Sequence, residues 1–256
     1  MGVSVTVKKE LQKTLDQILD NTVNRLGGVP GVVAMVTDRN GNIYEGAAGV
    51  RDLNTKTPMS LDTVFALFST TKAITGAVLM KLVEEGKVDL HHPAKEYVPE
   101  IADIMVLEGF DDNGNPILRK PKTDITVNML MLHTAGFGYE FFSEDEQKYR
   151  DYAKVPPTLA SSKETLKSVL LFEPGRRWNY GINIDWIGQI IEAVTGKRLG
   201  EVMAKTIFKP LGIKDIAFTL TPFMLERRAT IHTRSEDGTL TPNPDIIVPQ
   251  PPPNNT

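Results

Sequence analysis

A serine and a lysine stand three residues apart in the stretch ALFSTTKAITG, residues 66–76. Residues with this spacing share a helix face, so Ser69 and Lys72 would bring a hydroxyl and an amine together. An unpaired buried ammonium is costly, so we expect burial to lower the pKa of Lys72 and make its neutral amine available as a base. The pair could therefore form an acyl-enzyme on the serine.

Ser69 is expected to begin a helix, where its backbone N–H would face a developing oxyanion. A structural alternative stays open at this point. Ser69 could cap the helix by accepting from the amide of Thr71 or Lys72, while the lysine extends into solvent. With 8 serines and 18 lysines in 256 residues, Ser-x-x-Lys is expected about 0.6 times by chance, so the motif alone does not decide.

A tyrosine in a second stretch, LFEPGRRWNYGINIDWIG at residues 171–188, adds a third reactive group. Tyr180 follows a Pro-Gly turn and precedes a predicted helix. A tyrosine at such a loop tip could share a proton with a lysine and pass it to a leaving group. Nucleophile, base and acid would then come from two distant segments.

Hydrophobic spacing predicts the elements that must position these groups. β-Branched runs flank Asn40-Gly41, a dipeptide suited to a hairpin turn, and glycines end the predicted helices. We expect helices over residues 7–26, from Ser69 to Gly86, over 126–133, and over 183–195 with a continuation to Pro210, and antiparallel strands at about 31–37 and 42–49.

Composition and turn residues suggest a domain plan. Residues 1–86 would hold the first helix, the hairpin and the nucleophile helix of an α/β lobe. Residues 87–170, rich in proline, asparagine and glycine, would form a mostly helical inserted lobe. Residues 171–240 would carry the tyrosine loop and helices, and 241–256 is a proline-rich tail that cannot form a helix or an interior strand.

Charge and residue counts exclude several functions. A net charge of −3 with scattered basic residues disfavours nucleic acid as a partner. Without cysteine there is no thiolate chemistry, the four histidines lack metal-ligand spacing, and no phosphate-binding glycine loop occurs. We expect a soluble, cytoplasmic protein that needs no metal or cofactor and spans no membrane, since no long apolar run or signal segment is present.

The chain resembles the penicillin-recognising serine hydrolases, which include class C β-lactamases, D-alanyl-D-alanine carboxypeptidases and family VIII carboxylesterases. The resemblance extends over about residues 30–220 and rests on three stretches in the family's order: FALFSTTKAITGAVLMKLVEEGKVDLHHPAKEYVPEI, ITVNMLMLHTAGF and FEPGRRWNYGINIDWIGQIIEAVTG. It implies Ser69 as acylated nucleophile, Lys72 as its proton acceptor and Tyr180 as the second-motif tyrosine. The implied fold is α/β, with an antiparallel sheet flanked by helices and an inserted helical lobe.

Two departures from the family pattern qualify this resemblance. The second-motif asparagine is one place late, at Asn183, which weakens a β-lactamase assignment and favours an esterase. The third motif, Lys-Thr-Gly or a variant on a sheet strand, has no counterpart, because Thr195-Gly196-Lys197 has the wrong order. We expect the chain to lack the C-terminal strands, and a C-terminal segment of the same protein to complete the fold and supply the second oxyanion donor.

The expected substrate is a small-molecule carboxylic ester, short-chain or aryl, cleaved through an acyl-enzyme on Ser69. Tyr139 and Phe141, in a loop after glycines, are the expected apolar contacts for it, with Asn183 as a further contact. His133 is interpreted as a structural residue at a helix end. The alternatives are a β-lactamase or peptidase, an acyltransferase, or a catalytically silent binding module.

Overall fold

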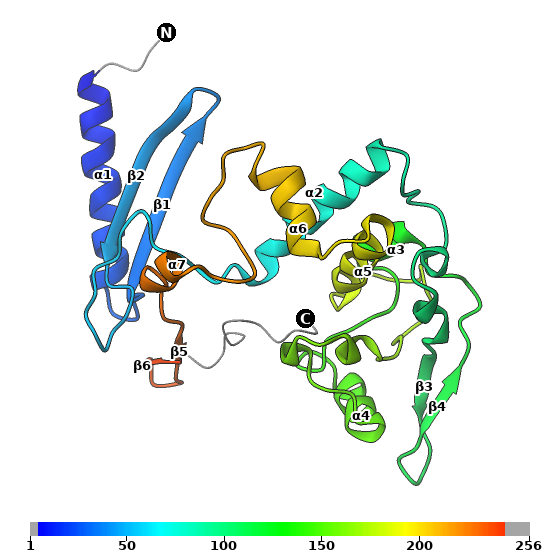
Figure 1. The fold of residues 1–256 in the computed structure, drawn as a ribbon. Helices are drawn as coiled ribbons and strands as arrows, with labels where there is room; N and C mark the ends of the chain where they lie inside the picture. Colours follow the sequence, from blue (N-terminus) through cyan, green and yellow to red (C-terminus); the bar gives the residue numbers. More distant parts are fainter. Residues whose placement is uncertain (1–4, 244–256) are drawn as a thin grey trace. The chain divides into compact units, whose positions relative to one another are not determined.

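The computed structural model describes residues 5–243, and within this range the chain divides into two compact units. Unit 1 combines residues 5–66 with residues 220–243, and unit 2 is the continuous stretch 67–219 (Figure 1). Most of the predicted tail, residues 241–256, lies outside the described range. Ser69, Lys72 and Tyr180 all belong to unit 2.

Unit 1 is built on an amphipathic helix and a β-hairpin. Helix α1 (Val5–Asn24) is followed by strands β1 (Gly31–Asp38) and β2 (Gly41–Gly49), which pair antiparallel. Tyr44 of β2 is buried, and its hydroxyl donates to Asp16 Oδ1 of α1 at 2.9 Å. The predicted first helix and both predicted strands are confirmed.

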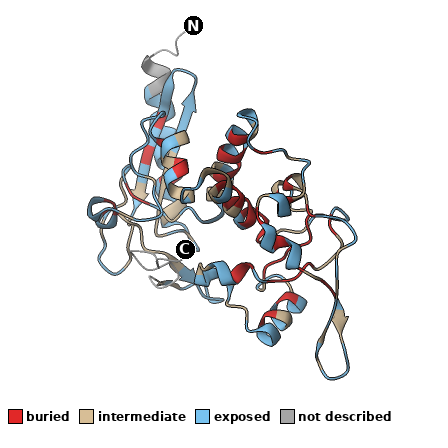
Figure 2. Cartoon of the chain, turned by 45° about the vertical axis from the view of Figure 1, so that its right-hand side comes forward, coloured by how far each residue is buried: buried red, intermediate tan, exposed pale blue. Residues whose placement is uncertain are grey.

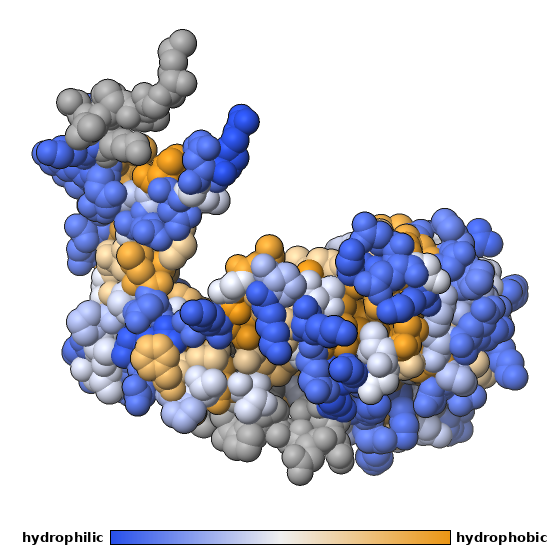
Figure 3. Space-filling view, turned by 45° about the horizontal axis from the view of Figure 1, so that its top comes forward, coloured by the Kyte–Doolittle hydropathy of each residue, from blue (hydrophilic) through white to orange (hydrophobic). Residues whose placement is uncertain are grey.

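The hairpin turn differs from its prediction by one residue. Asp38 pairs with Gly41, so Arg39 and Asn40 form the two-residue turn, and Gly41 opens β2 with a φ of 132°. A register shift between Val36 and Thr37 accompanies this change. A sheet of two strands leaves apolar side chains exposed, Val36 among them, and apolar atoms reach the surface among polar ones in Figure 3.

The last described residues return to unit 1. They contain helix α7 (Pro222–Glu226) and a second hairpin, formed by β5 (His232–Arg234) and β6 (Leu240–Pro242). Thr221 caps α7 by accepting from Met224 N at 3.2 Å. The amide of Ala229 donates to the carbonyl of Val64 at 2.8 Å, which fixes this return segment against the chain that precedes Ser69.

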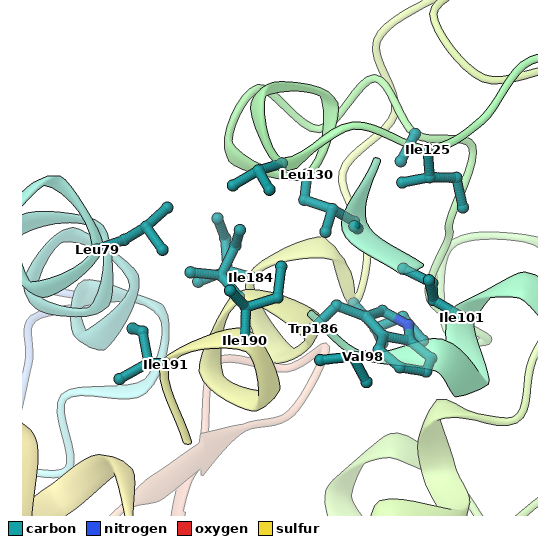
Figure 4. Packing of buried hydrophobic residues seen from close by; sticks show 14 of the residues in the cluster. Leu79, Val98, Ile101, Ile125, Leu130, Ile184, Trp186, Ile190 and Ile191 are labelled. Carbon is teal, nitrogen blue, oxygen red and sulfur yellow. The ribbon is translucent and has the colours of Figure 1, made fainter. Parts of the chain in front are cut away.

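The core of unit 2 forms where helices α2 (Thr71–Glu84) and α5 (Asn183–Thr195) pack together. Leu79 of α2 and Ile190 and Ile191 of α5 are fully buried, and Figures 2 and 4 show how burial gathers on these helices. Each such side chain stabilises the fold by about 1.5–3 kcal/mol. Their packing fixes the first turns of both helices, beside which the expected site residues lie. The bounds predicted for the second helix, 183–195, are confirmed.

The region 87–170 contains a β-hairpin that the sequence did not predict. Strands β3 (Val106–Phe110) and β4 (Pro116–Arg119) pair antiparallel around a turn in which Asp111 Oδ1 accepts from the amides of Asn113 and Asn115 at 2.9 and 2.8 Å. The remaining elements are short helices, as expected: η2 (Ala94–Glu96), η3 (Pro99–Asp103), α3 (Val127–Met131), α4 (Glu144–Ala153), η4 (Thr158–Ala160) and η5 (Lys163–Leu166).

A buried ion pair ties α4 to the segment that follows it. Arg150 is 2% exposed and donates from Nε to Glu146 Oε1 at 2.9 Å, while its other nitrogens donate to the carbonyls of Pro156 and Thr165 at 2.7 and 3.0 Å. Burial raises the pKa of Glu146, although Ser168 and Arg150 oppose this. The pair therefore holds the irregular chain between α4 and η5 in one conformation.

After α5 the chain resumes as α6 (Leu199–Met203) and the π-helical turn η6 (Ala204–Phe208), which end before Pro210 as predicted. None of the described helices combines the length and the apolar character needed to cross a bilayer.

Candidate active site

Ser69 lies in a 3-10 turn, η1 (Phe68–Thr70), that leads directly into α2. Phe68 has a φ of 44°, a left-handed conformation that costs a non-glycine residue roughly 1–2 kcal/mol. No side-chain hydrogen bond caps η1 or α2, and the N-cap position of α2 is Thr70. The capping alternative for Ser69 is therefore wrong, because its exposed hydroxyl faces other side chains.

Lys72 lies one helical turn after Ser69 and donates from Nζ to Ser69 Oγ at 3.3 Å. Desolvation lowers the pKa of Lys72, but hydrogen bonding with Tyr139 and Tyr180 and the charge of Asp185 outweigh it. The pKa therefore lies above its ordinary value of 10.5. The expectation that burial would lower this pKa is wrong, since the lysine is only partly buried and its neighbours favour the ammonium form.

Tyr180 reaches the same oxygen from 111 residues further along the chain, donating its hydroxyl to Ser69 Oγ at 2.7 Å. Its loop is held from both sides, because Asn179 N donates to the carbonyl of His133 at 2.8 Å and Asn179 Nδ2 donates to the carbonyl of Phe137 at 3.0 Å. A side chain at Gly181 would come within 2.5 Å of that Phe137 carbonyl. The close approach of the Tyr180 loop to the Phe137 carbonyl therefore requires a glycine at position 181. With the loop held there, Ser69, Lys72 and Tyr180 lie together, as the sequence predicted.

Tyr139 is buried and lies beside Lys72. The Lys72 ammonium is 5.6 Å from the centre of the Tyr139 ring and 5.1 Å from that of Tyr180. Burial and the charge of Asp185 raise the pKa of Tyr139 to about 12, so its phenol is neutral at physiological pH. Tyr139 thus favours the ammonium form of Lys72. The ring of Phe141 stacks on the ring of Tyr139, with centres 4.8 Å apart, and Phe141 keeps 55% of its surface exposed.

Asn183, expected from the sequence to contact the substrate, is fully buried at the first position of α5. Its amide lies 3.0 Å from His133 Nδ1 instead. The helix that begins at Asn183 turns this side chain inward, and the amide of the second motif is therefore used to hold structure.

Two residues of the site were not identified as such from the sequence. Asp185, on the first turn of α5, adds to the hydrogen bonds with Tyr139 and Tyr180 that favour the Lys72 ammonium, although desolvation raises the pKa of Asp185 itself. His133 contacts the ring of Tyr180, with centres 4.8 Å apart. Asp185 could have been noticed in the sequence as a carboxylate five residues after the motif tyrosine. The contact between His133 and Tyr180 could be recognised only from the folded structure.

Comparisons with known proteins agree with this geometry. The family model described as Beta-lactamase matches residues 16–248. The chain belongs to the β-lactamase family. It is 36% identical over 226 residues to ML-236A carboxylate methylbutanoyltransferase of Penicillium citrinum, covering 84% of this chain and 54% of that protein. It is 38% identical over 199 residues to lovastatin esterase of Penicillium rubens, covering 75% and 49%.

Among solved structures, unliganded simvastatin synthase of Aspergillus terreus superposes with a TM-score of 0.81 at 32% identity, over 94% of this chain and 62% of that one. The chain thus has the β-lactamase-like fold expected from the sequence. It spans about half the length of the curated relatives that it matches. Its family contains serine hydrolases and acyltransferases, in keeping with a serine hydroxyl contacted by a lysine and a tyrosine.

Proposed function

We propose that this β-lactamase-family chain carries the acylation groups of an enzyme that cleaves carboxylic esters through an acyl-enzyme on Ser69. One observation carries the proposal. Ser69 Oγ accepts from both Tyr180 and Lys72, at 2.7 and 3.3 Å, so either group is placed to receive the serine proton. Short-chain and aryl esters are the proposed substrates.

In the proposed reaction the Lys72–Tyr180 pair first gives up a proton to solvent, because the lysine is an ammonium at rest. Ser69 Oγ then attacks the ester carbonyl while its proton passes to the pair. The C–O bond to the alcohol breaks, and the leaving alcohol takes a proton from Tyr180. Water or a second alcohol attacks the acyl-enzyme and gives its proton to the pair. The bond from the acyl carbon to Ser69 Oγ then breaks, and Ser69 Oγ takes that proton back.

A second candidate is transfer of the acyl group to an alcohol acceptor. It is favoured by relatives named as methylbutanoyltransferases, beside one named as an esterase. Exposed rings next to the site suit an apolar acceptor, since Phe142 and Trp178 keep 72% and 65% of their surface exposed and contact Tyr139 and Tyr180 respectively. A β-lactamase is less favoured, because Asn183 is fully buried and its amide nitrogen contacts His133.

The test is an activity panel with p-nitrophenyl acetate and butyrate, nitrocefin and a D-Ala-D-Ala peptide, with and without an added long-chain alcohol. We expect ester turnover that Ser69→Ala abolishes and the control Ser162→Ala retains. A transferase would divert product to the new ester when the alcohol is added. If the parent neither turns over an ester nor forms an adduct with a serine-directed phosphonate, the proposal fails and a binding module remains.

We also propose that the second oxyanion donor comes from a C-terminal segment, as the greater length of the relatives suggests. An intact-mass measurement of an active sample tests this. Full activity from a 28.3 kDa monomer alone would overturn it.

A further inference from the structure

His133 makes three kinds of contact with the Tyr180 loop. Its carbonyl accepts from Asn179 N at 2.8 Å, and its ring Nδ1 lies 3.4 Å from the donating amide of Gly181. Its ring also packs on that of Tyr180, with centres 4.8 Å apart. The residues before and after Tyr180, and Tyr180 itself, are thus all held by one side chain and its backbone.

The ring performs this role as a neutral group. Since Gly181 N–H donates to Nδ1, Nδ1 is an acceptor, and the Asn183 amide at 3.0 Å must be its second donor. The ring proton is then on Nε2. Burial and the charge of Lys72, the cation that faces the ring from α2, lower the pKa of His133 to about 4, so this state holds at physiological pH.

The backbone at His133 is also unusual. Its φ is 56°, a left-handed conformation that is uncommon for non-glycine residues, although histidine adopts it more often than most, as asparagine and aspartate do. The turn after α3 adopts this conformation and brings both the carbonyl and the ring of His133 to the Tyr180 loop. A residue that served only to end the helix would need neither the ring contact nor the Nδ1 acceptor.

From these contacts we infer that His133 is the positioning residue of Tyr180: as a neutral acceptor and packing surface, it sets the tyrosine hydroxyl against Ser69 Oγ. The inference rests on the proposed function, because it assigns His133 a part in acylation through Tyr180. An error of about 1 Å in placing such a group can cost about a hundredfold in rate. We therefore expect His133→Ala to lower kcat about 10- to 100-fold and to change KM less than about threefold.

The test is a double-mutant cycle with Tyr180→Phe, measured by p-nitrophenyl acetate turnover and by the rate of phosphonate labelling. If His133 acts through the tyrosine hydroxyl, His133→Ala slows the parent but causes no further loss in the Tyr180→Phe background. A full and additive loss in both backgrounds would overturn the inference. The exposed His91, changed to Ala, is the matched control and should leave both rates unchanged.

Two further variants separate the contacts and guard against misfolding. His133→Asn tolerates the left-handed backbone and keeps an acceptor near the Nδ1 position, whereas His133→Phe keeps a ring without an acceptor. We expect the Asn variant to recover more labelling rate than the Phe variant. If His133→Ala does not fold, the cycle with His133→Asn decides. A parent that neither turns over nor labels would count against the proposed function, whereas a labelled parent with an additive cycle counts against His133 alone.

Discussion

Replacing Lys72 by arginine tests whether the lysine gives up its proton during acylation. Lys72→Arg keeps a positive charge beside Ser69 Oγ, but a guanidinium does not deprotonate in the accessible pH range. The pKa of Lys72 lies above 10.5, so fewer than about one in a thousand of these side chains are free amines at pH 7.5. Each unit of pH should raise that fraction, and with it the acylation rate, about tenfold.

The assay is the single-turnover release of p-nitrophenol between pH 6.5 and 9.5, after subtraction of the Ser69→Ala rate. We expect the parent to rise with a slope near one on logarithmic axes, and Lys72→Arg to be roughly 10²- to 10⁴-fold slower, as for the loss of a general base. Lys81→Arg, an exposed position on the same helix, is the matched control. If Lys72→Arg kept both the slope and most of the rate, Lys72 would be only a fixed cation and Tyr180 the proton acceptor.

The remaining predictions concern stability and substrate size. Because the pKa of His133 is lowered from 6.5 to about 4, its neutral form stabilises the fold above pH 6.5, and this stability is lost as pH falls toward 4. The full shift of the pKa corresponds to roughly 3 kcal/mol of unfolding free energy, and the partial solvent access of the ring reduces this to about 1–2 kcal/mol. Urea unfolding should show it as a pH-dependent difference in stability between the parent and His133→Asn. Glu146→Gln removes the nearer of the two carboxylates beside the buried Arg150, with Glu140 remaining at 3.6 Å, and should cost roughly 1–3 kcal/mol in the same assay. Removal of the exposed Lys81–Glu84 pair should cost less than about 1 kcal/mol. Phe142→Ala should raise KM for long-chain or aryl esters while leaving p-nitrophenyl acetate nearly unchanged, and an equal effect on both would exclude a substrate contact.

The parts of the fold that sequence predicted have local causes. Helix α5 carries apolar residues at helical spacing and ends where Gly196 adopts a φ of 65°, so both of its bounds could be predicted. The β3–β4 hairpin could not, because its strands are short and one begins with a proline. Its position is fixed by Leu170, whose carbonyl accepts from Leu107 N at 2.9 Å, and contacts of this range leave no local pattern.

In the candidate site, too, the features with local causes could be predicted from the sequence, and those fixed by long-range contacts could not. Helical spacing predicted that Ser69 and Lys72 share one face, and residue chemistry pointed to Tyr180, so the three groups that meet in the structure were predicted from the sequence. The direction in which the pKa of Lys72 shifts was not predicted, because it depends on Tyr139, Tyr180 and Asp185, which lie far along the chain and meet the lysine only through packing.

Asn183 has a suitable residue type and position for a substrate contact, yet its side chain is fully buried where α5 begins. Its amide contacts the ring of His133, so under the role proposed for His133 it would act through that residue. A change at Asn183 should therefore act on the Tyr180 loop and not on ligand affinity, and its effect on kcat should also vanish in the Tyr180→Phe background. Motif chemistry thus predicted the three groups that meet at Ser69, while the histidine–asparagine contact behind them is proposed to set how accurately the tyrosine meets the serine.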